Sequence, residues 1–200
     1  MHTRSIFTAL LTLAAAACKA ERTPASSGDT TTPVASAQPA PPPADTTSTP
    51  PLADAEWTVT ADGIGALRVG MTAEDLRRVG GDFTKPGTSS CVYVRPSRLP
   101  AGVMVMLGNG VVARVDVDST GVRTDAGIGV GDAADKVNAA YGDRVTATPH
   151  KYVQGGQYLS VRPTSPSDSN RRIVFETENG RVARFRSGRL PEVEWVERCG

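Results

Sequence analysis

The 200-residue sequence predicts an α+β protein in which two tandem αβββ repeats form one head, with helices packed on one face of an antiparallel sheet. Two observations predict this fold class. One sequence pattern occurs twice between residues 57 and 200, and each copy contains an Asn-Gly pair between alternating apolar segments. Residues 19–54 lack the apolar content of a packed domain. We therefore place repeat 1 at residues 57–125 and repeat 2 at residues 126–200.

The duplication is visible as three blocks that recur in the same order, with a spacing that grows only through predicted loops. Such self-similarity indicates an internal repeat. The matching blocks are 69–76 with 130–137, 94–96 with 161–163, and 109–115 with 179–185.

Each repeat begins with a predicted helix. The side chains of Thr72 and Asp132 can accept the free amide hydrogens of a helix start, and an aspartate follows three residues later in both copies. Both segments run into a glycine, Gly81 or Gly142, a residue type that commonly ends helices. We expect a short helix between each start and its glycine.

The strands follow from the Asn-Gly pairs at 109–110 and 179–180, which are the strongest short-range signal for a β-hairpin. One further strand precedes each hairpin and completes three strands per repeat. The expected hairpins pair 103–107 with 111–117 and 173–177 with 181–186, and the additional strands lie near 91–95 and 158–162.

Alternation along these strands divides the side chains between two faces of the sheet. The face toward the helices is apolar and comprises Val92, Val94, Val103, Val105, Leu107, Val111, Ala113, Val115, Leu159, Val161, Ile173, Phe175, Ala183 and Phe185. The opposite face is rich in Tyr, Met and Arg, the composition of a protein-binding surface. The predicted partner-binding residues are Tyr93, Arg95, Met104, Met106, Arg114, Tyr158, Arg162, Arg184 and Arg186. The alternative is that a loop or the other repeat covers Met104 and Met106.

The beginning of the chain reads as an export signal. Residues 1–17 combine an early arginine with an apolar run too short for a retained membrane helix. The run ends in Ala15-Ala16-Ala17-Cys18, which resembles the bacterial lipobox and implies that Cys18 is lipidated. Cleavage by signal peptidase I, which would leave Cys18 as a free thiol, is the alternative.

Residues 18–56 are predicted to form a disordered linker behind the lipidation site. Residues 19–54 hold eight of the 15 prolines and no aromatic residue, so they cannot bury enough surface to offset chain entropy. The linker would hold the head away from a membrane. Lys19, which stands where an aspartate would retain an enterobacterial lipoprotein in the inner membrane, implies an outer-membrane location facing the periplasm.

The cysteine count agrees with export. Without Cys18 the chain keeps only Cys91 and Cys199, an even pair for an oxidising compartment. We expect these two residues to form a disulfide, with two buried free thiols as the alternative.

The helix start Val69-Gly70-Met71-Thr72-x-x-x-Leu76, which ends in glycine and is followed by a meander, resembles the repeat of the BamE (SmpA/OmlA) outer-membrane lipoproteins. Two tandem copies are similar to the secreted β-lactamase inhibitory protein of the same structural group. The resemblance implies helices on one face of a sheet whose other face binds a protein, without catalysis. No contact residue of either family has a matching motif here.

The sequence argues against several chemistries. A formal net charge of +1 does not suit a nucleic-acid binder. His150 is the only histidine after the leader, so neither a zinc site nor a serine triad has its parts. Asp116 and Asp118 share a strand face but lack a loop of oxygen ligands, and Gly127–Gly131 lacks the spacing of a phosphate-binding loop. We expect no catalytic residue, metal or cofactor.

These observations predict an exported, lipid-anchored envelope protein that is not an enzyme. Its expected role is a protein-binding module, such as an accessory subunit, adaptor or inhibitor, with another envelope protein as partner. The alternative is a lipoprotein that binds a cell-wall glycan or another anionic ligand through its arginine-rich side, around Arg171, Arg172, Arg184 and Arg186.

Overall fold

The computed structural model describes residues 57–84 and 87–199. The predicted export signal, the lipidation site Cys18 and the linker lie outside the described residues. Among the described residues, no helix is long and apolar enough to cross a membrane.

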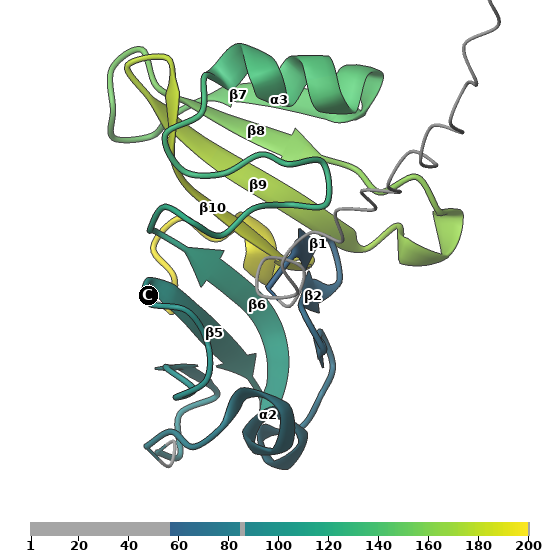
Figure 1. The fold of residues 1–200 in the computed structure, drawn as a ribbon, viewed down its shortest axis with the longest axis vertical. Helices are drawn as coiled ribbons and strands as arrows, with labels where there is room; N and C mark the ends of the chain where they lie inside the picture. Colours follow the sequence, from purple (N-terminus) through teal and green to yellow (C-terminus); the bar gives the residue numbers. More distant parts are fainter. Residues whose placement is uncertain (1–56, 85–86, 200) are drawn as a thin grey trace, which may run out of the picture. The chain divides into compact units, whose positions relative to one another are not determined.

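The main element is a seven-stranded sheet in which every neighbouring pair of strands is antiparallel (Figure 1). Its spatial order is β4-β5-β6-β10-β9-β8-β7, so two meanders meet where β6 pairs with β10. The strands are β4 (Cys91–Val94), β5 (Val103–Gly108), β6 (Val111–Val117), β7 (Val145–Pro149), β8 (Gln157–Val161), β9 (Arg171–Glu178) and β10 (Arg181–Arg189).

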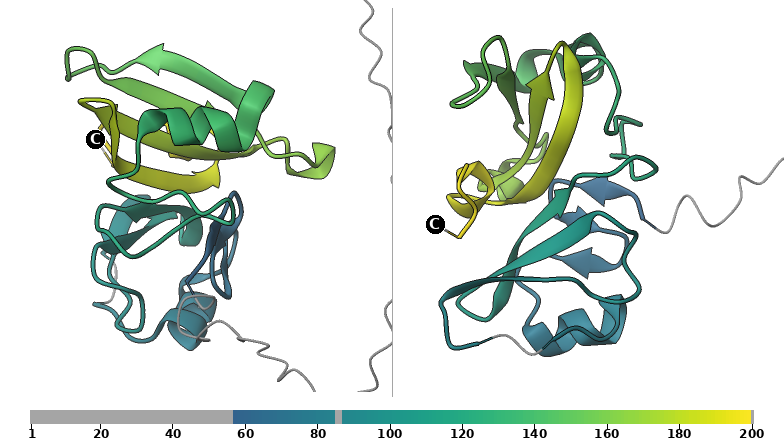
Figure 2. Two further views of the ribbon diagram at one scale, coloured as in Figure 1. Left: turned by 45° about the horizontal axis from the view of Figure 1, so that its top comes forward. Right: turned by 90° about the vertical axis from the view of Figure 1, so that its left-hand side faces the viewer.

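A second, three-stranded sheet and two short helices complete the fold. Figure 2 shows the small sheet beside β6 and α3 against the half of the main sheet that contains β9. The small sheet comprises β1 (Val59–Thr60), β2 (Gly63–Ile64) and β3 (Leu67–Arg68). The helices are α2 (Ala73–Gly80) and α3 (Ala134–Tyr141), and single 3-10 turns are η1 (Gly142–Arg144), η2 (Pro166–Asp168) and η3 (Glu192–Glu194).

The prediction of an α+β fold built from helix-on-sheet αβββ repeats is therefore wrong, because the described chain is mainly β. Each helix has eight residues and spans about 12 Å. Seven strands spaced about 4.8 Å apart form a much wider surface, so two such helices cover only part of it. The small sheet supplies further core side chains, including the fully buried Val59, Ile64 and Leu67.

The two predicted hairpins are confirmed. β5 pairs with β6 and β9 pairs with β10. Both turns place Asn and Gly at positive φ, with 53° and 81° at Asn109 and Gly110 and 50° and 72° at Asn179 and Gly180. Positive φ at both central residues defines the type I′ turn, which Asn-Gly adopts with least strain.

One β-bulge in each hairpin changes which residues face the core. Register shifts leave Ala113 and Ala183 without a partner residue on the opposite strand. Val112 and Val182 consequently point into the core, where both are almost completely buried. The prediction that Val111, Ala113 and Ala183 face the core is wrong, because strict alternation does not continue across a bulge.

The first helix starts and ends as predicted. The Thr72 hydroxyl accepts a hydrogen bond from the Asp75 amide at 3.1 Å, and the Asp75 carboxylate accepts one from the Thr72 amide at 3.2 Å. This reciprocal pair is a capping box. Gly81 follows the last helical residue at a φ of 84°.

The second helix starts differently from the prediction. Its N-cap is Ala133, which makes no side-chain capping bond. Asp132 instead accepts the Gly129 amide at 3.0 Å and forms ion pairs with Arg123 at 2.8 Å and Lys136 at 3.0 Å. The amide hydrogen bond from Gly129 and these cations lower the pKa of Asp132 to about 2. Asp132 therefore fixes the loop before α3 instead of capping the helix.

Both helices contribute to one hydrophobic core. Leu76 of α2 and Val137 of α3 are fully buried in it. Tyr141 packs on Phe175 with ring centroids 5.9 Å apart, and Phe175 packs on Phe185 at 5.5 Å. The core thus lies on the face of the sheet that alternation assigned to apolar side chains.

Candidate functional site

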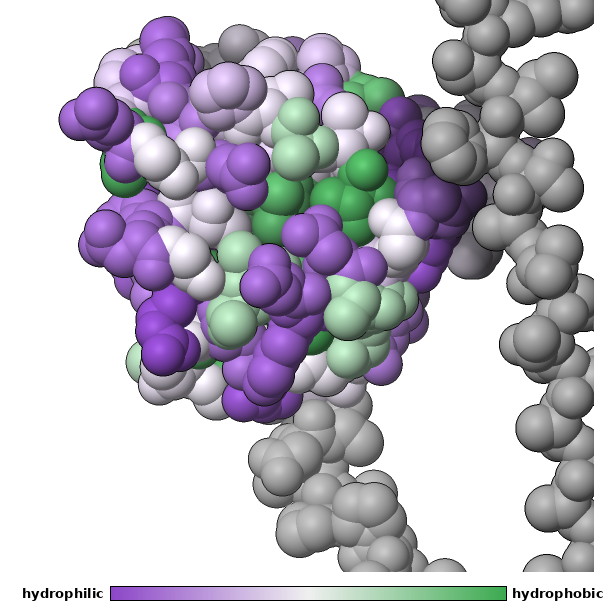
Figure 3. Space-filling model, turned by 90° about the horizontal axis from the view of Figure 1, so that it is seen from above, coloured by the Kyte–Doolittle hydropathy of each residue, from purple (hydrophilic) through white to green (hydrophobic). Residues whose placement is uncertain are grey.

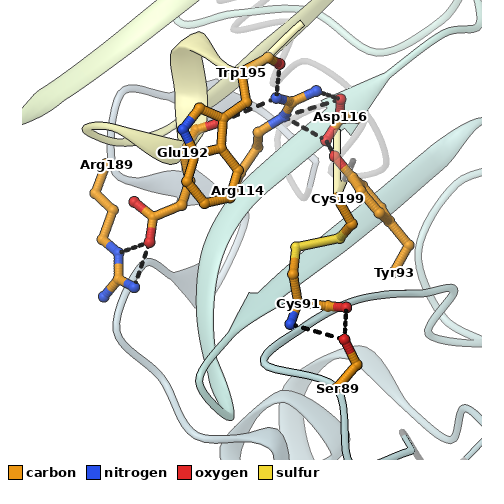
Figure 4. The surroundings of a disulfide bond; sticks show 9 residues. All are labelled: Ser89, Cys91, Tyr93, Arg114, Asp116, Arg189, Glu192, Trp195 and Cys199. Atoms are coloured by element: carbon orange, nitrogen blue, oxygen red, sulfur yellow. Dashed lines mark hydrogen bonds and ion pairs between the residues drawn. A yellow bond between two sulfur atoms is a disulfide. The ribbon is translucent and has the colours of Figure 1, made fainter. Parts of the chain in front are cut away.

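The end of the chain crosses the sheet face for which we predicted a protein partner. We call residues 190–199 the C-terminal strap. The Arg114 guanidinium donates hydrogen bonds to the carbonyl oxygens of Glu192 at 3.1 Å and Trp195 at 2.7 Å (Figure 4). Arg186 donates through Nε to the carbonyl oxygen of Val193 at 2.5 Å. Two arginines of the sheet therefore hold the strap by its backbone.

Arg114 belongs to a buried charged network. Its Nη2 lies 2.5 Å from Asp116 Oδ1, and its Nε donates to Asp116 Oδ2 at 2.9 Å. The Tyr93 hydroxyl donates to the same carboxylate at 3.0 Å. Burial, and secondarily the negative charge of Asp116, raise the pKa of Tyr93. Through these contacts, Tyr93 and Asp116 hold the Arg114 side chain in position.

A disulfide ties the end of the strap to an edge of the sheet. Cys91 of β4 and Cys199 are bonded, with Cα atoms 5.6 Å apart, a separation typical of such bonds (Figure 4). The bond joins positions 108 residues apart in the sequence. The strap is consequently fixed at its far end as well as along its length.

Arg186 has its own carboxylate partner. It forms an ion pair with Glu176, which also lies 3.5 Å from Arg184 Nε. Burial lowers the pKa of Arg186, and the nearby positive charge of Arg114 acts in the same direction. Both arginines that hold the strap are therefore buried and paired with acids.

His150 has a structural place in this arrangement. Its Nδ1 accepts the backbone amides of Tyr152 and Val153, each at 3.1 Å, which puts the ring proton of the neutral form on Nε2. Nε2 lies 3.5 Å from a Glu176 oxygen, and the ring stacks on Tyr158 at a centroid distance of 4.4 Å. His150 thus orders the turn after β7.

The structure divides the nine predicted partner-binding residues into distinct environments. Four are buried, namely Met104, Met106, Arg114 and Arg186. Tyr93 and Tyr158 are half-buried, whereas Arg95, Arg162 and Arg184 are exposed. The prediction of one partner surface made of all nine residues is wrong, because four of them are inaccessible. Met104 and Met106 are covered, as in the alternative interpretation.

A groove remains on the same face of the sheet, beside the strap. We call it the β7–β9 groove, and its cavity volume is about 480 Å³. Strands β7 to β9 supply one side and the strap supplies Glu194 and Val196. The polar lining residues on the sheet side are Thr146, Thr148, Tyr158, Ser160, Arg162, Arg172 and, from β10, Arg186.

The predicted arginine-rich ligand side is mostly neutralised within the head. Three of its four arginines form ion pairs with carboxylates, and Arg172 forms none with the described residues. The pairs join Arg171 to Asp62 and both Arg184 and Arg186 to Glu176. The four residues therefore do not form one anion-binding cluster.

The threonines of the groove were not among the predicted site residues, because β7 was not among the predicted strands. The signal was present, since Val145-Thr146-Ala147-Thr148 alternates and contains three β-branched residues before Pro149. Ser160 lay in a predicted strand but was not selected, because a lone serine on a strand carries no specific chemistry.

The described part of the chain holds no group of three His, Cys, Asp or Glu residues placed to bind a metal ion. Asp116 is paired with Arg114, so it does not lie free beside Asp118. Around Gly127–Gly131, the Arg123 guanidinium donates to the Gly127 carbonyl at 2.7 Å, and the segment forms the turn that leads to α3.

The fold and groove define a mainly antiparallel β head with a polar, partly covered sheet face. No family model and no curated protein match the chain, so the likeness to the BamE lipoproteins stays a resemblance of sequence pattern. Among solved structures, the chain is similar to the uncharacterized protein yfeY from Escherichia coli, with 11% sequence identity and a TM-score of 0.41. That match covers 66% of this chain and 99% of the other.

Proposed function

We propose that this chain is an exported, lipid-anchored binding protein of the bacterial envelope, whose head binds a ligand in the β7–β9 groove without transforming it. The pattern of residues 1–17 before Cys18 supports export and anchoring. The Cys91–Cys199 disulfide is consistent with an oxidising compartment.

The groove is the observation that carries the binding role. Its volume of about 480 Å³ lies within the range of small-ligand sites. Its lining combines hydroxyl groups such as those of Thr148 and Ser160 with the apolar side chains of Val174 and Val196. Such a mixture can bind a ligand by apolar contact and orient it by hydrogen bonds.

Binding of a protein partner is the second candidate function. It is favoured by Tyr152 and Trp195, which are 64% and 41% exposed and belong to the residue types that dominate protein interfaces. They are the only large hydrophobic residues so exposed in the described ranges. The face in Figure 3 is hydrophilic around its edge, with a small hydrophobic area near the centre. Two aromatic side chains make a smaller apolar patch than most docking surfaces, so the groove is the better supported site.

Lipid anchoring is tested by the mass of the mature chain. We expect the N-terminal peptide of the protein from membranes to begin at Cys18 and to carry a diacylglyceryl modification. The Cys18→Ala variant will lose this added mass, while its Cys91–Cys199 bond provides the control for export. A water-soluble mature chain that begins at Cys18 with a free thiol would contradict the proposal and support cleavage by signal peptidase I.

The binding role is tested by filling the groove. Ser160→Trp places an indole ring among the lining residues, and Asn138→Trp, on an exposed position of α3, is the matched control. Native mass spectrometry of the full protein purified from envelopes is expected to detect a ligand on the wild type and on Asn138→Trp but not on Ser160→Trp. Equal ligand occupancy of all three proteins, or no ligand on any, would overturn the groove as the binding site.

A further inference from the structure

Two arginines, Arg162 and Arg172, line the β7–β9 groove where the pairing of β8 with β9 ends. Val161 of β8 pairs with Ile173 of β9 in the antiparallel register. Arg162 directly follows Val161 and Arg172 directly precedes Ile173, so both arginines lie next to the last paired position of the two strands.

Neither arginine forms an ion pair with a carboxylate among residues 57–84 and 87–199. Arg162 Nη2 donates to the carbonyl oxygen of Asp143 at 2.9 Å, and Arg172 Nη1 donates to that of Ser169 at 2.8 Å. These bonds orient the side chains without neutralising them. The Nε of each guanidinium donates to no atom of the described residues, so donors remain for a ligand.

Like charges close together on neighbouring strands repel each other, and an anion between them removes that repulsion. The planar guanidinium fork matches the oxygens of a carboxylate or phosphate group, which two arginines can bind together. We propose that the groove binds an oxyanion, the phosphate or carboxylate group of a hydroxylated ligand, between Arg162 and Arg172. This inference deepens the proposed function and rests on the groove being the binding site.

The rest of the lining places the anion at this end. Arg186 also lines the groove, but its charge is balanced by Glu176. Glu194 of the strap is the one acidic residue of the lining and forms no ion pair with either arginine. The unbalanced positive charge therefore belongs to Arg162 and Arg172.

The body of the ligand follows from the side chains next to the arginines. The hydroxyls of Thr146, Thr148 and Ser160 come from two neighbouring strands and line the same groove. The register pairs Thr146 with Ser160, so their side chains are cross-strand neighbours. Hydroxyl groups both donate and accept hydrogen bonds, which suits a ligand with hydroxyls of its own, such as an acidic sugar.

Calorimetric titration of the full mature protein in detergent tests the proposal with galacturonate, inorganic phosphate and neutral galactose. Galacturonate and galactose share a ring and differ at one carboxylate, so their comparison isolates the anion. We expect galacturonate or phosphate to bind saturably and galactose to bind at least tenfold more weakly. Arg162→Gln/Arg172→Gln should weaken anion binding at least tenfold, whereas Arg95→Gln, at an exposed arginine that does not line the groove, should leave it unchanged.

Stronger binding of phosphate than of galacturonate would assign the site to phosphate groups, and the reverse order would assign it to carboxylates. Equal affinity for galactose and galacturonate, or unchanged anion binding by the double variant, would overturn the oxyanion site. A neutral native ligand that Ser160→Trp displaces would overturn this inference alone and leave the proposed function intact. A native ligand that Ser160→Trp does not displace would remove both.

Discussion

Replacing Arg114 by methionine will lower the free energy of unfolding by about 3–5 kcal/mol, the usual cost of removing one member of a buried ion pair. Asp116, 6% exposed, would be left in a buried site without its main partner. The carbonyl oxygens of Glu192 and Trp195 would also lose their donor. Methionine fits the site, because Arg114 pairs with Met106 across β5 and β6. Urea denaturation of the full mature chain measures the change.

Two further variants test whether the loss of stability comes from breaking a buried ion pair or from removing any positive charge. Arg78→Met removes an exposed ion pair with Asp75, and we expect a change below about 1 kcal/mol. Arg114→Met/Asp116→Leu removes both buried charges and should be more stable than Arg114→Met alone, since no isolated charge remains. A loss in Arg114→Met as small as that in Arg78→Met would show that the strap does not depend on this network.

The parts of the fold that the sequence predicted have short-range causes. An Asn-Gly pair adopts the type I′ turn by its own backbone preferences, and the register of the two flanking strands follows from that turn. The Thr72–Asp75 capping box likewise involves residues three positions apart. Such signals depend on few neighbours, so they survive in almost any tertiary context.

The fold class was not predictable from those signals because the strands of the second sheet are too short to show a pattern. β1, β2 and β3 have two residues each, too few to show any alternation. Asp132 fits a helix N-cap by sequence, yet the loop before α3 uses its carboxylate for the Gly129 amide and Arg123. Tertiary contacts thus decided these positions against their local preferences.

In the candidate site, too, the sequence predicted what short-range patterns determine and not what tertiary contacts determine. Alternation placed Met106, Arg114 and Tyr158 on one face, as the strand registers require. It could not show what covers that face, because Arg114 and Trp195 lie 81 residues apart in the sequence. The groove exists only after the strap has crossed the sheet, so its lining could not be deduced from single strands.

Removing the disulfide will lower the free energy of unfolding by about as much as the loss of Arg114. In the chain-entropy model, a cross-link that spans 108 residues stabilises the folded state by about 4–5 kcal/mol. We expect Cys91→Ala/Cys199→Ala to lower the free energy of unfolding by up to that amount in urea denaturation. Cys18→Ala, which alters a cysteine outside the described head, is the matched control and should unfold at the wild-type urea concentration.

The Cys91→Ala/Cys199→Ala variant also shows whether the disulfide is needed to hold the strap against the sheet. Arg114 and Arg186 hold residues 192–195 independently of the disulfide, so this part of the strap should stay on the sheet. Residues 196–199 keep only exposed contacts, those of Glu197 with Lys151 and Tyr152 among them, and should loosen more. Val196 lines the groove, so ligand affinity should fall in the folded variant. Limited proteolysis of the folded variant should then cut the chain after residue 195. Cleavage before residue 192 would mean that the covalent bond, and not the buried arginines, holds the strap against the sheet.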